Sequence, residues 1–249
     1  MRIRLIFPLI IITGLLNCKA QSGSQDKKEM KELKELINTD EPGWELLEEW
    51  FAKATNHFDT LPRNKERAEK ELYNAQVTTR SPMGAIIYQS GGILVDHGWI
   101  RILGSGHPRL DRGIMEWNKG KTYTETGQQP SYIIVADDVV GGYFALNGGG
   151  LKGKVGDMFY YAPDSLEWEN MEMGYSQFIY WTLTGNLEKF YETLRWKTWK
   201  EDTAQLDGNR VFSFFPFLFT KQEGIDSLSR EAVPVDELFD LHIGLKNKK

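Results

Sequence analysis

The sequence predicts an α+β protein with a central, mainly antiparallel sheet flanked by N-terminal and C-terminal helices. Three observations support this. Apolar residues recur at helical spacing before residue 75, short β-rich runs separated by glycine and aspartate turns fill the middle, and helical spacing returns after residue 175. Helices gathered at the ends of a run of strands are typical of α+β chains.

The N-terminal helices are expected in three segments. The first covers residues 33–37, the second residues 44–54 and the third residues 64–74. Pro42 and Gly43 separate the first two, because neither residue suits a helix interior.

The sheet is expected to follow as a meander of short strands. The expected strands are residues 85–88, 92–95, 99–103, 132–136, 143–146, 157–161 and 166–169. β-branched and aromatic residues dominate these runs, and turn residues lie between them. Residues 108–130 are polar and irregular, as in a long surface connection.

Helices are expected to return after the sheet. Residues 175–184 and 187–194 show helical spacing, and residues 235–245 form a last helix. One further strand-like run, residues 211–219, is interrupted by Pro216.

The N-terminus has the pattern of a secretory signal peptide over residues 1–20. Arg2 and Arg4 precede an apolar run, residues 5–16, that is too short to span a bilayer. The sequence therefore predicts an exported protein, either periplasmic or anchored to a membrane as a lipoprotein.

Two cleavage sites compete in this segment. Cleavage before Cys18 would leave a lipidated cysteine, which is slightly favoured, and ordinary cleavage after Ala20 would remove it. Residues 21–32 then form a polar tether and residues 33–249 a single domain. Contact with a membrane is expected only through a lipid on Cys18.

Composition excludes one class of partner and one source of stability. The formal charge is −5, and removal of Arg2 and Arg4 changes it to −7 (−5 − 2), so no general basic field exists to hold nucleic acid. Cys18 is the only cysteine, so stability must come from an apolar core and not from a disulfide.

Candidate chemical groups lie in three loops. Asp96 and His97 precede the strand at 99–103, and Ser105 and His107 follow it, so the two histidines are expected at opposite ends of that strand. Turn formation and hydrogen bonding are therefore preferred over a metal site, and no cofactor is expected. A flexible glycine loop is likewise preferred over a nucleophile at Ser105.

Asp137 and Asp138 are neighbours on a strand, so their side chains are expected on opposite faces, and a turn is preferred over an acid–base pair. Arg101 alternates with isoleucines and is expected to face out of the core. Ion pairing within the protein is preferred for Arg101 over ligand binding.

Three stretches, residues 36–44, 76–85 and 91–99, together with the N-terminal signal, resemble the bacterial family catalogued as domain of unknown function twenty-six twenty-five. The resemblance covers residues 33–245. That family has no established activity, so the resemblance implies no mechanism.

A weaker resemblance is to the SUKH superfamily. In this sequence an acidic glycine turn lies between strands rich in aromatic residues, and a helix whose first residues are 175–181 follows. This order is similar to the core of those proteins. The resemblance implies an α+β binding module, of a kind that often neutralises bacterial toxins by direct contact. SUKH immunity proteins are mostly cytosolic, so the export signal here departs from them and would place any toxin outside the cytoplasm.

The sequence therefore predicts a non-enzymatic exported module that binds a protein or a small envelope ligand through exposed loops on the sheet. The residues expected at that contact surface are Asp96, His97, Arg101, Ser105, His107, Arg109, Asp137, Asp138 and Tyr143. The alternative is a hydrolase or metal-dependent enzyme that uses the Asp96–His97 and Ser105–His107 loops. It requires these side chains to converge in one cleft.

Overall fold

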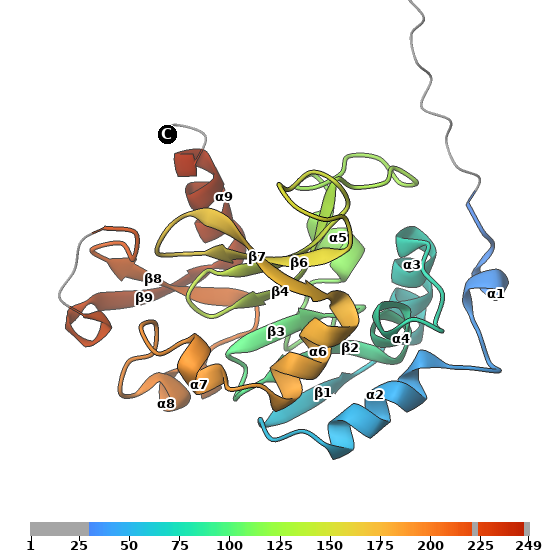
Figure 1. Cartoon of the computed structure of the whole chain (residues 1–249), viewed down its shortest axis with the longest axis horizontal. Coiled ribbons are helices and arrows are strands. Elements are labelled where there is room, and N and C mark those ends of the chain that lie inside the picture. The colour runs from blue at the N-terminus through green and yellow to red at the C-terminus, as the bar shows by residue number, and fades with distance from the viewer. Residues whose placement is uncertain (1–29, 221–223, 247–249) are drawn as a thin grey trace, which may run out of the picture.

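The computed structural model describes residues 30–220 and 224–246, whose centre is a seven-stranded antiparallel sheet (Figure 1). Strand order in the sheet equals strand order in the chain. The strands are β1 (Phe58–Pro62), β2 (Ser90–Val95), β3 (Ile100–Leu103), β4 (Tyr132–Asp138), β5 (Tyr143–Asn147), β6 (Asp157–Ala162) and β7 (Glu167–Gly174). This arrangement confirms the predicted α+β class and the antiparallel sheet.

The helices gather on either side of this sheet (Figure 1). The first four helices are α1 (Leu33–Leu36), α2 (Gly43–Ala52), α3 (Lys65–Ala75) and α4 (Pro82–Gln89), of which α4 contacts α2, α3 and β2, while α5 (Ile114–Asn118) connects β3 to β4. The chain after the sheet forms α6 (Tyr175–Thr184), α7 (Leu187–Phe190), α8 (Trp199–Ala204), a small second sheet of β8 (Arg210–Phe215) and β9 (Ser229–Pro234), and α9 (Val235–Lys246). A 3₁₀ turn, Ile225–Ser227, precedes β9.

Both faces of the central sheet are covered, as two neighbouring aromatic residues of β5 show. Tyr143 packs against Phe239 of α9 and Trp117 of α5, whereas Phe144 packs against Phe178 of α6. Successive strand residues point to opposite faces, so these contacts place α5 and α9 on one face and α6 on the other.

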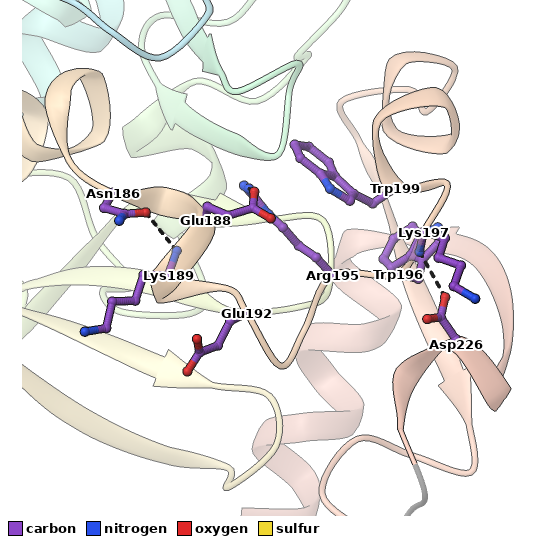
Figure 2. A pocket seen from close by; sticks show the side chains of 9 residues that line it. All are labelled: Asn186, Glu188, Lys189, Glu192, Arg195, Trp196, Lys197, Trp199 and Asp226. Atoms are coloured by element: carbon purple, nitrogen blue, oxygen red, sulfur yellow. Dashed lines mark hydrogen bonds and ion pairs between the residues drawn. The ribbon is translucent and has the colours of Figure 1, made fainter.

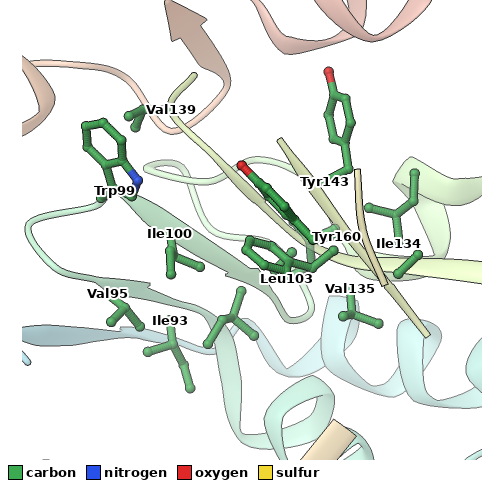
Figure 3. Packing of buried hydrophobic residues seen from close by; sticks show 14 of the residues in the cluster. Ile93, Val95, Trp99, Ile100, Leu103, Ile134, Val135, Val139, Tyr143 and Tyr160 are labelled. Atoms are coloured by element: carbon green, nitrogen blue, oxygen red, sulfur yellow. The ribbon is translucent and has the colours of Figure 1, made fainter. Parts of the chain in front are cut away.

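The core therefore extends through the sheet rather than lying on one side of it. All six residues of β2 and all four residues of β3 are buried. Figure 3 shows Tyr143 rising from one face of the sheet and Val135 from the other. Strands buried on both faces read as continuous apolar runs and not as an alternating pattern.

Residues 85–88 were expected to form a strand, and this prediction is wrong. They lie in α4, whose N-cap Ser81 accepts a hydrogen bond from the Gly84 amide at 3.1 Å, with Pro82 in the first helical turn. A serine followed by proline is a helix-start signal. The apolar run after it is buried on all sides, so it lacks the helical periodicity that would have identified it.

Other elements were missed or shortened. β1 and β9 were not expected, and α5 lies inside the segment assigned to an irregular connection. α7 covers only part of the helix expected over residues 187–194. These elements are short, so sequence periodicity distinguishes them poorly from loops.

The predicted signal peptide, Cys18 and most of the predicted tether lie outside the described residues. Within residues 30–220 and 224–246, no helix combines the length and apolar character needed to cross a membrane.

Substitution of Gly84 tests how closely α4 packs, and Gly244 of α9 is the control. A Cβ on Gly84 would overlap the backbone carbonyl of Thr78, whereas a Cβ on Gly244 in α9 would meet nothing within 4 Å. We expect Gly84→Ala to lower the free energy of unfolding by about 1–3 kcal/mol, because backbone atoms must shift. Gly244→Ala is expected to raise it by up to about 1 kcal/mol through helix propensity. Urea denaturation measures both, and equal effects would contradict the close packing.

Candidate functional site

The turn between β2 and β3 has an unusual backbone that positions two of the predicted site residues. Asp96 and His97 both have positive φ, 51° and 60°, and the Gly98 amide donates to the Val95 carbonyl at 3.2 Å. Two successive positive φ values define a type I′ turn, which matches the twist of a hairpin. Aspartate and histidine adopt this left-handed conformation more readily than most side chains do.

The two side chains of this turn make contacts with distant parts of the chain. The Asp96 carboxylate accepts a hydrogen bond from Arg195. The His97 ring stacks on His57 with centroids 4.7 Å apart and meets the edge of Trp199 at 6.3 Å. The turn is thus held between the segment before β1 and the segment around α8.

Arg195 is enclosed by aromatic rings. Its guanidinium carbon lies 3.9 Å from the Trp199 ring centroid, 4.9 Å from that of Trp99 and 5.3 Å from that of Tyr191. Its side chain is 5% exposed, and it also pairs with Glu188 at 3.1 Å. Cation–π contacts and the Asp96 pair fix its position. Sequence reasoning missed Arg195, although a cation in an aromatic-rich segment was a usable signal.

Arg195 forms part of the floor of an open groove of about 700 Å³, lined by the nine residues labelled in Figure 2 and called here the Arg195 groove. Buried Trp196 and Trp199 complete the floor. Figure 2 shows Glu188, Lys189 and Glu192 on one side of Arg195, and Lys197 and Asp226 on the other. The exposed rim therefore carries charges of both signs.

A buried ionic triad lies between β3, β4 and the segment before α5. Arg101 Nε donates to Asp137 Oδ1 at 2.5 Å, and Arg112 donates to the other oxygen of the same carboxylate. The side chains of Arg101, Asp137 and Arg112 are 1%, 0% and 5% exposed. Burial lowers the pKa of Arg101, against the opposing effect of Asp137.

The predicted outward orientation of Arg101 is wrong, although its predicted ion pairing is confirmed. Arg101 stands opposite Asp137, and Asp137 stands opposite Tyr143, so all three side chains share the face that α5 and α9 cover. Polar groups on that face must therefore pair within the protein.

Asp138 points to the other face and forms the turn that the sequence predicted. Its carboxylate accepts hydrogen bonds from the Val140 and Gly142 amides at 3.1 and 2.7 Å. It also accepts from the hydroxyls of Tyr160 at 2.7 Å and Tyr191 at 3.2 Å. Burial raises the pKa of Asp138, while these hydrogen bonds oppose the shift.

A second hollow, of about 130 Å³, opens beside the Asp96–His97 turn. We call it the turn pocket and define it by its polar lining, His97, Arg101, Arg109, Thr203, Asp207 and Gly208. Arg101, Thr203 and Gly208 are buried, whereas His97, Arg109 and Asp207 are exposed. The pocket brings together three residues that the sequence selected.

Ser105 and His107 do not join this pocket. The Ser105 hydroxyl is buried and donates to the Ser90 carbonyl at 2.8 Å. His107 Nδ1 accepts from the Arg109 amide at 3.1 Å. Their side chains line neither the turn pocket nor the Arg195 groove, so the structure does not gather the four residues of the enzymatic alternative in one cleft.

The predicted contact residues divide into a buried and a partly exposed group. Ser105, Asp137, Asp138 and Tyr143 were expected on exposed loops, but all four are buried because both sheet faces are covered. Asp96, His97, His107 and Arg109 are at least partly exposed. Among the described residues, no group of three His, Cys, Asp or Glu side chains could hold a metal ion.

Fold and site together define an α+β protein with a central antiparallel sheet. Two polar hollows lie near the left-handed Asp96–His97 turn that joins β2 to β3. The chain belongs to the family described as protein of unknown function DUF2625, whose model matches residues 33–238. This confirms the resemblance seen in the sequence.

Two relatives are similar over most of their length. An uncharacterized protein of Haemophilus influenzae is 43% identical over 220 residues, covering 88% of this chain and 96% of that protein. The putative uncharacterized protein YbfG of Escherichia coli K12 is 44% identical over 217 residues, covering 87% and 98%. No solved structure matches the chain. The similarity to the SUKH superfamily finds no support in these matches and stays a prediction.

The ionic triad is expected to stabilise the fold strongly. Asp137→Asn leaves Arg101 and Arg112 buried without an anionic partner, so we expect a loss of about 3–5 kcal/mol in the free energy of unfolding. Glu41→Gln removes the exposed pair with Arg80 and should cost less than about 1 kcal/mol. Urea denaturation compares them. A loss for Asp137→Asn no larger than for Glu41→Gln would contradict a stabilising triad.

His242 in α9 should make stability depend on pH. It is 4% exposed, and burial lowers its pKa from 6.5 to about 4. Since the folded state binds the proton more weakly, this contribution is complete above pH 6.5 and is lost as pH falls toward 4, by roughly 3 kcal/mol. His242→Leu should lack this part of the pH dependence in denaturation between pH 4 and 7. An unchanged slope would show that His242 is not the group responsible.

Proposed function

We propose that this protein is an exported, non-enzymatic binding module that holds a protein partner or a small envelope ligand in the Arg195 groove. The observation that carries the proposal is the groove itself, a hollow of about 700 Å³ with a rigid floor and a charged rim. That volume lies within the range of roughly 300–1,000 Å³ typical of ligand sites.

The floor of the groove is held in place before any ligand arrives. Asp96 and Glu188 bond Arg195, and Trp99 packs against both Trp196 and Trp199. A preorganised surface loses less conformational entropy on binding than a mobile one. The floor is therefore suited to recognition.

The rim favours a ligand that carries charges of both signs. Its exposed residues include Lys189 and Lys197 together with Glu188, Glu192 and Asp226. Opposite charges placed a few residues apart complement a peptide segment with both acidic and basic groups better than a simple ion. Of the predicted contact residues, Asp96 bonds Arg195 and His97 contacts Trp199, both in the floor of the groove.

Binding is proposed rather than catalysis because the candidate catalytic groups are otherwise engaged. The Ser105 hydroxyl and a His107 ring nitrogen hydrogen-bond to the main chain, and neither residue lines the Arg195 groove or the turn pocket. Export rests on the predicted signal peptide, and a lipid on Cys18 would tether the domain to a membrane surface.

Site-specific photo-crosslinking in cells tests the groove. The full-length chain would carry a photoreactive amino acid at Lys189 or Glu192 on the rim, or at Lys65 on α3 as an exposed control. We expect the same adduct from both rim positions and not from Lys65. A further probe, placed at Lys197, tests the charge pattern of the rim. In a chain that carries both Lys189→Glu and Glu192→Lys, the adduct formed at position 197 should fall about tenfold, because the two charges have been exchanged.

Two results would count against the proposal. Equal adducts from Lys65 and the rim would indicate nonspecific capture, and no adduct at any rim position would remove the groove as a contact surface. Mass spectrometry of the mature N-terminus in the same preparations checks export, since an intact chain beginning at Met1 would contradict it.

A further inference from the structure

We infer that the turn pocket is a binding site for a small oxyanion, a carboxylate or phosphate group, held by Arg101, Arg109 and Thr203. This inference is independent of the proposed groove, because the two hollows have no lining residue in common. It rests on charge balance, on hydrogen-bonding capacity and on the size of the pocket.

Charge balance behind the pocket favours an anion. Arg101 and Arg112 share the single carboxylate of Asp137, so the buried triad carries one positive charge in excess. The neighbouring Asp138 points to the opposite face of β4, toward Tyr160 and Tyr191. Asp138 still attracts Arg101 from that face, so the excess charge is offset only in part, and an anion beside Arg101 would offset it further.

Arg101 has hydrogen-bonding capacity that the protein does not use. Its guanidinium donates to Asp137, to the Arg210 carbonyl at 2.6 Å and to the Asp138 carbonyl at 2.7 Å. A guanidinium has five N–H donors, so two have no acceptor among the described residues. Because Arg101 is buried and lines the pocket, a ligand oxygen is a suitable acceptor.

Thr203 offers a second unused polar group. It lines the pocket, is 3% exposed, and its hydroxyl is buried without a hydrogen-bond partner in the described structure. Burial of an unpaired hydroxyl costs free energy, and valine would fill the same volume without that cost. A hydroxyl at this position is therefore explained more readily by a ligand than by packing.

The mouth of the pocket adds a second cation and one opposing carboxylate. Arg109 is largely exposed and pairs with Asp59, while Asp207 accepts a hydrogen bond from the Asn209 amide at 2.8 Å. The two arginines in the lining thus outnumber the single carboxylate. The volume of about 130 Å³ is below the usual range for larger ligands, so the pocket suits one anionic group.

Calorimetric titration at constant ionic strength tests this site in the mature protein. Inorganic phosphate and acetate are the probes, and chloride is the reference ion. We expect binding of phosphate or acetate in excess of chloride, weakened about tenfold or more by Arg109→Gln, since a charge-assisted hydrogen bond is lost. Arg80→Gln, which removes a similarly exposed arginine paired with Glu41, should leave affinity unchanged.

Thr203→Val separates ligand binding from a structural role. We expect this variant to be at least as resistant to urea as the natural protein, yet to bind the anion several-fold more weakly. Asp207→Asn should bind it several-fold more tightly, because the opposing charge is removed. These variants keep the test informative where substitution of buried Arg101 would unfold the chain.

Each result of these titrations supports or contradicts a stated part of the inference. No binding beyond that of chloride, or equal weakening by Arg109→Gln and Arg80→Gln, would overturn the inference. Unchanged affinity in folded Thr203→Val would remove Thr203 from the site. Phenyl phosphate distinguishes the source of the anion, since affinity like that of phosphate indicates the terminal group of a larger ligand, and exclusion indicates a free ion.

Discussion

The packing of the second sheet and α9 against the central sheet depends on the carboxylate of Asp137. It joins Arg101 of β3 to Arg112 in the connection before α5. The same two arginines donate to the carbonyls of Arg210 and Gly208, at the start of the second sheet. One buried anion therefore links the central sheet to the layer that covers it, in a setting where charge pairing is strong because water is excluded.

That linkage explains why the second face of the sheet is closed. Once Arg101 and Arg112 hold residues 208–210 against the sheet, α9 follows and packs Phe239 against Tyr143. Polar residues on that face can no longer reach solvent and must find partners inside. The turn pocket lies at the margin of this closure, where Arg101 meets residues of α8 and the segment after it.

The Asp96–His97 turn performs the same linking role for the hollows. Asp96 bonds Arg195, which lines the groove, while His97 lines the turn pocket and contacts Trp199. Specific contacts of this one turn therefore reach the lining of both hollows. A left-handed turn maintained by surrounding structure is a common way of presenting side chains for recognition.

The sequence by itself determined the α+β class, the central meander, the last helix and the family, because these depend on local periodicity and turn residues. It also placed Asp137 and Asp138 on opposite faces of a strand, since alternation is a property of the strand alone. Only the tertiary structure decided that both faces are covered, which buried Arg101 and Tyr143. The Ser81–Pro82 start of α4 was present in the sequence, but the buried apolar run after it showed no helical spacing. Arg195 and Thr203 reach the hollows, and Arg112 reaches Asp137, from distant segments of the chain, and such long-range contacts leave no periodic signal in the sequence.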